Sequence, residues 1–174
     1  MLEQQRGELI LDEGTRLVVY DDATGQPIRP GDHVIGHPSI GIGRALDVHG
    51  VTQAEARYLF VNDILQVESE LAAQAFFQKL DPVRQGVLVN LAFNLGIHGL
   101  MTFTRMLDAM GHQNWEVAAA ELRNSRWANQ VQRSRRDRLI EQLRTGSLAV
   151  AAPALSPHEQ LNEAELNRIR GPRP

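Results

Sequence analysis

The chain has 174 residues, of which 43% are hydrophobic and 22% charged, and its net charge is −3. This length and composition can bury a substantial core, which excludes a chain that is disordered throughout, and the negative balance offers no general attraction to nucleic acid. With no cysteine and no apolar run near the roughly 20 residues of a membrane span, disulfide-held and integral membrane classes are excluded as well.

The N-terminal quarter carries the densest pattern of turns, strands and carboxylates. Residues 9–13 predict a short apolar helix that ends on Glu13, because Gly14 follows. Residues 16–20 are β-branched and alternating, as in a strand, and residues 21–25 have turn chemistry that includes Asp22. Ser39-Ile-Gly-Ile-Gly43 then adds a hydroxyl and two glycines that let a backbone or a ligand approach closely.

Glu13 and Asp22 are two carboxylates in unlike settings. Hydrolysis of a glycosidic bond needs such a pair, because one carboxyl must donate a proton to the leaving oxygen while the other is ionised. Glu13 follows three apolar residues, which favour a protonated carboxyl, whereas Asp22 lies in a polar turn. From the spacing alone, two surface carboxylates at a helix end and in a hairpin are the commoner arrangement.

The rest of the chain predicts helices. Thr52 and Glu55 form a capping-box pattern, and apolar residues then recur near a helical period, so we expect a long helix over about 52–79. Asp81-Pro82 caps the next helix, which is apolar on nearly every side and ends at Gly96. Further helices are expected over residues 102–110, 115–124 and 133–143. The predicted fold class is therefore α+β, predominantly α.

Two parts of the chain carry no chemical motif that we can assign. Residues 147–174 indicate a linker followed by a short helical tail of unknown role. The six histidines are scattered, and His33 and His37 are separated by Gly36 and followed by Pro38, so they should not converge on zinc from one helix. We expect no metal and no cofactor.

A family resemblance sharpens these predictions. The pattern Glu13-Gly-x-x-Leu17-x-x-Tyr20-x-Asp22-x-x-Gly25, followed by Ser39-Ile-Gly-Ile-Gly43, resembles the phage-type lysozymes (glycoside hydrolase family 24). The resemblance continues in the family's order to about residue 146 through Leu80–Arg84, Asn90–Gly96, Phe103-Thr104, Trp115, Ser125–Trp127 and Arg144–Gly146. It implies a lysozyme-like domain over 1–146, with a small N-terminal lobe (about 1–51) with short β-strands, a connecting helix (about 52–79) and an all-helical lobe (about 80–146).

The resemblance also implies roles for individual residues. Glu13 matches the general acid, Asp22 the second carboxylate, and Ser39 the usual threonine that helps to hold the attacking water. Arg135 aligns best with the arginine that pairs with the acid, and Arg133 is the alternative. Substrate-binding positions are matched by Gly43, Phe93, Asn94, Met106 and Glu121.

Three departures from the family pattern stand out. Serine replaces threonine at Ser39, the segment over residues 26–38 is longer than in close relatives, and Arg44 replaces the usual histidine. None of these changes removes the pair of carboxylates.

The expected function is that of an endolysin, a muramidase that hydrolyses the β-1,4 bond between N-acetylmuramic acid and N-acetylglucosamine in peptidoglycan, with inversion. The N-terminus is not a secretory signal, so we expect synthesis in the host cytoplasm and release to the wall in the periplasm through another factor. We also expect a monomer, and the resemblance implies phage or prophage origin. Its partner would be the glycan strand, with no nucleic acid and no membrane segment. Two alternatives remain open: a lytic transglycosylase that uses Glu13 alone, and a catalytically inactive lysozyme-like module with a wall-binding or structural role.

Overall fold

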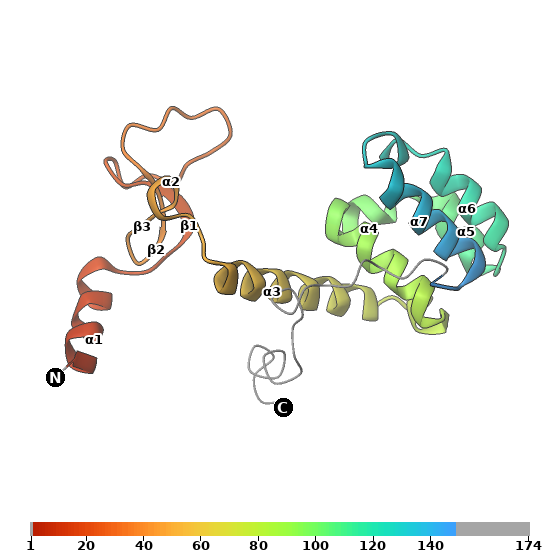
Figure 1. Ribbon diagram of the computed structural model, residues 1–174, viewed down its shortest axis with the longest axis horizontal. Helices are drawn as coiled ribbons and strands as arrows, with labels where there is room; N and C mark the ends of the chain where they lie inside the picture. The colour runs from red at the N-terminus through yellow and green to blue at the C-terminus, as the bar shows by residue number, and fades with distance from the viewer. Residues whose placement is uncertain (1, 149–174) are drawn as a thin grey trace. The chain divides into compact units, whose positions relative to one another are not determined.

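The computed structural model describes residues 2–148, and these residues form two compact units that divide between Arg57 and Tyr58. The described residues form seven α-helices and one small sheet near the N-terminus, which confirms the predicted α+β, mainly α, fold class (Figure 1). The lobe boundaries taken from the family stay a prediction, and the expected tail helix lies outside the described residues.

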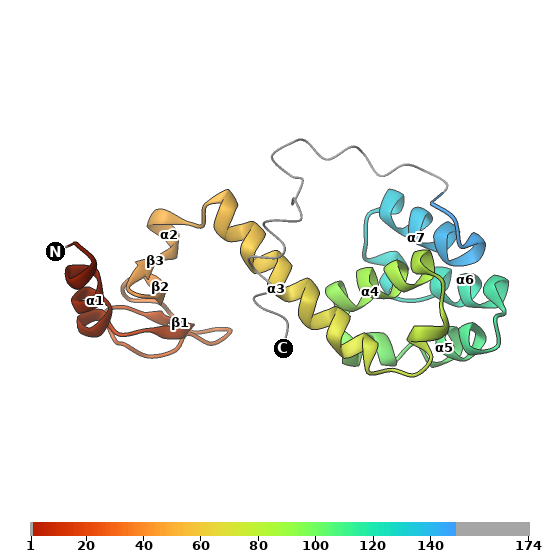
Figure 2. The same ribbon diagram turned by 90° about the horizontal axis from the view of Figure 1, so that it is seen from below.

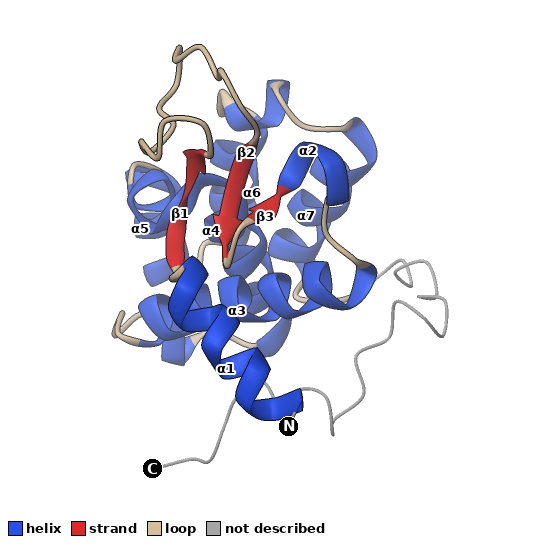
Figure 3. Cartoon of the chain, turned by 90° about the vertical axis from the view of Figure 1, so that its left-hand side faces the viewer, coloured by secondary structure: helices blue, strands red, loops and turns tan. Residues whose placement is uncertain are grey.

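The first unit is a small antiparallel sheet with a helix before it and a helix after it. Helix α1 spans Leu2–Glu13, and it is followed by strands β1 (Arg16–Asp21), β2 (Pro38–Gly41) and β3 (Arg44–Ala45) and by α2 (Leu46–His49). The strand order is β1-β2-β3, so β2 is the central strand (Figure 3). Chain neighbours are therefore sheet neighbours, although the connection from β1 to β2 is a long one.

The buried residues of this unit are polar. Within its described residues only Asp21 and Ser39 are buried, and α1 has no buried residue. Hydrogen bonds rather than an apolar core therefore organise the sheet and its long connection.

Helix α3 (Gln53–Ala72) begins at the predicted capping box and ends earlier than predicted. The Thr52 hydroxyl accepts from the Glu55 N–H at 3.2 Å, and the Glu55 carboxylate accepts from the Thr52 N–H at 2.7 Å. Instead of continuing to residue 79, the chain turns after Ala72 and forms a short 3₁₀ helix, η1 (Phe77–Lys79). This turn brings Phe77 into the core of the second unit, where it is 8% exposed.

The second unit is built around α4. The remaining elements are α4 (Pro82–Met101), α5 (Thr104–Gly111), α6 (Trp115–Arg123), η2 (Trp127–Asn129) and α7 (Arg133–Thr145). Figure 2 shows α5, α6 and α7 gathered with α4. As predicted, Asp81 caps α4 through the amides of Val83 and Arg84. Helix α4 supplies five apolar side chains that are at most 1% exposed: Val87, Leu88, Leu91, Ala92 and Leu100.

Gly96 interrupts α4, where the sequence predicted a helix end. Its backbone angles, φ 72° and ψ 161°, are not helical, and the chain resumes a helix on the far side up to Met101. The prediction of an apolar helix ended by Gly96 is thus right for the first segment, and the short helix beyond it was not foreseen. Among the described residues no single helix is long and apolar enough to span a bilayer, and only α4 and α5 taken together, across a 96° bend, reach that length and apolarity.

Candidate active site

Glu13 is the last residue of α1 and faces the turn between β2 and β3. Gly14 ends the helix with φ 69° while its N–H donates to the Ile10 carbonyl at 3.0 Å, so the chain leaves α1 immediately after the carboxylate. In that turn, Gly43 also has positive φ, and a Cβ built on it would lie 3.2 Å from Glu13 Oε2. The structure therefore brings Glu13 and Gly43 together, while their roles in catalysis and substrate binding stay predictions.

Asp22 lies one residue beyond β1 and is held by the chain that enters β2. Its Oδ1 accepts from the His37 backbone N–H at 2.7 Å, and its own N–H donates to the His37 carbonyl at 3.1 Å. These reciprocal bonds fix both the backbone and the carboxylate of Asp22. The donor is a backbone amide, so the Asp22 carboxylate is oriented by the fold and not by another charged side chain.

The neighbouring Asp21 carboxylate organises the long connection. It is 5% exposed and accepts from three amides, those of Ala23 (3.0 Å), Ile35 (2.8 Å) and Gly36 (3.0 Å). The amide of Ile35, followed by those of Gly36 and Ala23, holds the pKa of Asp21 below its usual range. The sequence indicated a turn at this point, and the family pattern selected Asp22, but no role was predicted for Asp21.

Ser39 lies in the middle of the sheet. Its partner in β1 is Tyr20 and its partner in β3 is Ala45, and its side chain is 1% exposed. Pairing on both sides and burial together fix the position of Ser39 in the sheet. The role of its hydroxyl toward an attacking water stays a prediction.

His37 forms an ion pair that the sequence did not reveal. Its Nδ1 lies 2.9 Å from Asp47 Oδ2, and the hydrogen bond with Asp47, together with the charges of Asp47 and Asp22, raises the pKa of His37. Asp47 lies on α2, ten residues farther along the chain, so no local motif signals the contact. Among the described residues no three histidine or acidic side chains group as a metal site would require.

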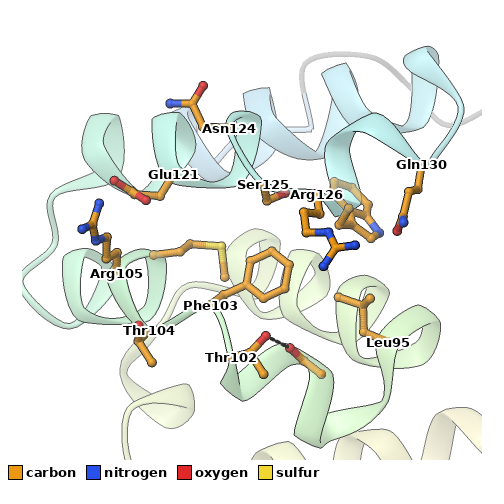
Figure 4. A pocket seen from close by; sticks show the side chains of 13 residues that line it. Leu95, Thr102, Phe103, Thr104, Arg105, Glu121, Asn124, Ser125, Arg126 and Gln130 are labelled. Carbon is orange, nitrogen blue, oxygen red and sulfur yellow. Dashed lines mark hydrogen bonds between the residues drawn. The ribbon is translucent and has the colours of Figure 1, made fainter.

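The second unit contains a cavity of about 510 Å³. It is bordered by the break in α4 and by α5, α6 and the turn before η2, and both Met106 and Glu121 line it. The Glu121 side chain is labelled in Figure 4. Phe103 and Trp127 give the lining an apolar part, and charged Arg105 and Arg126 give it a polar part. Two of the predicted substrate-binding residues are thus brought to one hollow.

Phe93 and Asn94 lie on the first segment of α4. Phe93 is 42% exposed and makes an edge-to-face contact with Phe60, with ring centroids 5.5 Å apart, so it is not a buried core aromatic. The Asn94 Oδ1 accepts from the indole N–H of Trp127 at 2.9 Å. Asn94 therefore orients a residue of the cavity wall.

Arg135 donates two hydrogen bonds to Asn90 Oδ1, at 2.7 and 3.0 Å. The alternative partner for Glu13, Arg133, lies 3.7 Å from Asp137. Glu13 and the two arginines belong to different units, and the expected ion pair with Glu13 stays a prediction.

Comparisons with known proteins identify the family of this chain. Residues 12–145 match the sequence model of the phage lysozyme family. A "Probable T4-type lysozyme 1" of Dictyostelium discoideum is 26% identical over 167 residues, which cover 85% of this chain and 98% of the relative. The "Pre-baseplate central spike protein Gp5" of Enterobacteria phage T4 is 30% identical over 155 residues, which cover 79% of this chain but only 27% of that protein.

Proposed function

This chain belongs to the phage lysozyme family and is therefore a glycosidase that hydrolyses peptidoglycan, and from this premise we propose that it is a muramidase. The bond cleaved would be the β-1,4 linkage between N-acetylmuramic acid and N-acetylglucosamine. The observation that carries the proposal is the separate fixing of two carboxylates in one small unit. Glu13 ends helix α1 beside Gly43, and Asp22 directly follows strand β1 and accepts a hydrogen bond from the His37 N–H.

Each carboxylate has one role in the proposed reaction. Glu13 donates its proton to the glycosidic oxygen as the bond from that oxygen to the anomeric carbon breaks. Asp22, with Ser39, orients a water molecule on the opposite face of the sugar and takes its proton as the new bond to the anomeric carbon forms. This order of events inverts the anomeric centre. A separation of roughly 6.5–9.5 Å between the two carboxyl groups would be required, because the water must fit between them.

The cavity of the second unit is the proposed site for a part of the glycan chain. Sugars present apolar ring faces and polar edges, and the lining offers the half-buried Phe103 for the first and Glu121 and Arg126 for the second. Glu121 would then select among sugar substituents at this position, whereas Met106, which is 1% exposed, would support the cavity wall from behind. The exposed side chain of Phe93 is proposed as a further contact for the glycan chain.

The test is the clearing of outer-membrane-permeabilised Gram-negative cells by wild type, Glu13→Gln and Asp22→Asn, with the soluble products analysed by mass. We expect clearing by wild type with reducing-end muropeptides, and a loss of at least about 100-fold in both variants, since each removes a proton-transfer group. Anhydro products together with an active Asp22→Asn variant would indicate a lytic transglycosylase instead. Wall binding without any clearing would indicate an inactive module.

We also propose an endolysin role, with synthesis in the host cytoplasm and action in the periplasm after another factor opens the inner membrane. Expression in a Gram-negative host with and without a membrane-permeabilising protein tests this. Lysis only in the presence of that protein is expected. Lysis by the chain alone would contradict the need for a release factor.

A further inference from the structure

The connection between β1 and β2, residues 22–37, is the part of the first unit that the family pattern explains least. We infer that Gly36 and His37 are positioning residues, which set the place of the Asp22 carboxylate relative to the bond that is cleaved. The inference rests on the proposed function, because it gives the connection a role in the same site. It is carried by three contacts of this connection.

The first contact fixes the end of the connection. The buried Asp21 carboxylate binds the amides of Ile35 and Gly36, at 2.8 and 3.0 Å, across fourteen and fifteen residues of chain. It also binds the amide of Ala23 at the beginning of the same connection. One buried carboxylate therefore joins both ends of the segment directly beside Asp22.

The second contact fixes the Asp22 carboxylate itself. Asp22 Oδ1 accepts from the His37 N–H at 2.7 Å, a distance typical of a strong hydrogen bond to a charged group. The same residue pair is joined through the Asp22 N–H and the His37 carbonyl at 3.1 Å. The side chain of His37 is in turn held by Asp47 of α2 at 2.9 Å, which limits movement of the donor.

The third contact explains why residue 36 is glycine. A Cβ on Gly36 would overlap Asp22 Oδ1 and would lie 2.8 Å from both the Cβ and the N of Ala23. Gly36 does not have a left-handed φ, so space and not backbone conformation excludes a side chain there. A single methyl group at this position must displace the carboxylate that is proposed to orient water.

Displacement of this kind affects the rate more than substrate binding. A misplacement of about 1 Å can cost on the order of 100-fold in a reaction that depends on alignment. Gly36→Ala should therefore lower kcat by about 10- to 100-fold and leave KM within about twofold, because the cavity of the second unit is unchanged. If Gly36 had a merely structural role, Gly36→Ala would lower the amount of folded enzyme, but the folded fraction would keep the kcat and KM of wild type.

Gly31→Ala is the matched control. Gly31 lies in the same connection and has φ 93°, so alanine strains the segment, but nothing lies within 4 Å of the added methyl group. We expect Gly31→Ala to keep a kcat close to that of wild type. A comparison of kcat and KM on soluble glycan chains then separates displacement of Asp22 from general strain in the connection.

A second measurement does not depend on activity. In nuclear magnetic resonance spectra of the isotope-labelled full chain, the His37 amide nitrogen and the Asp22 side-chain carboxyl carbon should show scalar coupling across their hydrogen bond. The coupling should be present in wild type and Gly31→Ala and absent in Gly36→Ala. It can be read in wild type even where Gly36→Ala does not fold.

The decisive comparison is the double variant Gly36→Ala/Asp22→Asn. If Gly36 acts through Asp22, this variant is no slower than Asp22→Asn alone. Three results would each overturn the inference. They are additive losses of kcat in the double variant, equal losses of kcat in Gly36→Ala and Gly31→Ala, and the absence of the coupling in wild type. A wild type that is inactive but shows the coupling would instead contradict the proposed function, while the hydrogen bond from the His37 N–H to the Asp22 carboxylate would stand.

Discussion

At the scale of single residues, Arg84 joins the beginning of α4 to the end of α7. Its guanidinium donates to the carbonyls of Leu143 (2.8 Å) and Arg144 (3.0 Å), pairs with Asp81 at 2.6 Å, and lies 3.8 Å from the centre of the Trp115 ring. These bonds satisfy carbonyls at the end of α7 that have no partner within the helix.

Arg84→Met should therefore destabilise the chain by about 2–4 kcal/mol, because it leaves buried carbonyls without a donor. Urea denaturation followed by circular dichroism measures this change. The exposed Arg133→Met is the control, with an expected change below about 0.5 kcal/mol. Similar values for the two variants would show that the bonds of Arg84 contribute little.

The same scale shows what the sequence could reveal of the site. Glu13 beside Gly14, and the glycines of residues 39–43, are local signals, and the structure brings Glu13 and Gly43 together. The adjacent aspartates look alike in sequence, because only the register of β1 against β2 decides that Asp21 is buried while Asp22 is exposed. The contact of His37 with Asp47 depends on the course of the long connection, so no spacing rule predicts it.

At the scale of elements, replacing two glycines of α4 by alanine should have opposite effects on stability. Gly96 has φ 72° and ψ 161°, a conformation that residues with a side chain rarely adopt, so Gly96→Ala should destabilise by about 1–3 kcal/mol. Gly86 lies in the regular part of the same helix with open space around it, so Gly86→Ala should stabilise by up to about 1 kcal/mol. Denaturant midpoints measure both variants. Shifts in the same direction would contradict the explanation by backbone conformation.

A second prediction at this scale concerns the contact between the β1–β2 connection and α2. The pKa of His37 is raised from 6.5, so its pairing stabilises fully below pH 6.5 and is lost as the pH rises through the raised pKa. The pKa of Asp47 is lowered from 3.8, so its contribution is present above pH 3.8 and lost as the pH falls through the lowered pKa.

The difference in melting temperature between wild type and Asp47→Asn should therefore be larger at pH 5 than at pH 9. Both side chains are about half exposed, so the effect should be small. A matched comparison of His37→Asn with His37→Asn/Asp47→Asn should show no such pH dependence. A difference between wild type and Asp47→Asn that is the same at pH 5 and pH 9 would exclude the ion pair as its source.

At the scale of the whole chain, the sequence predicted most helix starts because caps are local. Thr52 with Glu55, Asp81 and Asn114 each cap the helix that was expected at that point. Helix ends depended more on packing, and α3 ended seven residues early because Phe77 enters the core of the second unit. The family could be recognised because its motifs keep their order and spacing over most of the chain, as the match over residues 12–145 reflects.

The two units differ in how burial supports them, and this predicts unequal local stability. The described part of residues 1–57 buries only Asp21 and Ser39, whereas α4, α5, α6 and α7 share a continuous apolar core. Because burial of apolar side chains supplies most of the free energy of folding, the sheet should open without global unfolding.

Native-state hydrogen exchange of the full chain, read by mass spectrometry, tests this prediction. Amides of residues 16–45 should exchange with a lower opening free energy than those of residues 87–95, with little dependence on low denaturant. Asp21→Asn should accelerate exchange in residues 16–45 and leave residues 87–95 unchanged, since it weakens three hydrogen bonds of the first unit. Equal protection of the two segments would mean that the chain unfolds as one cooperative unit.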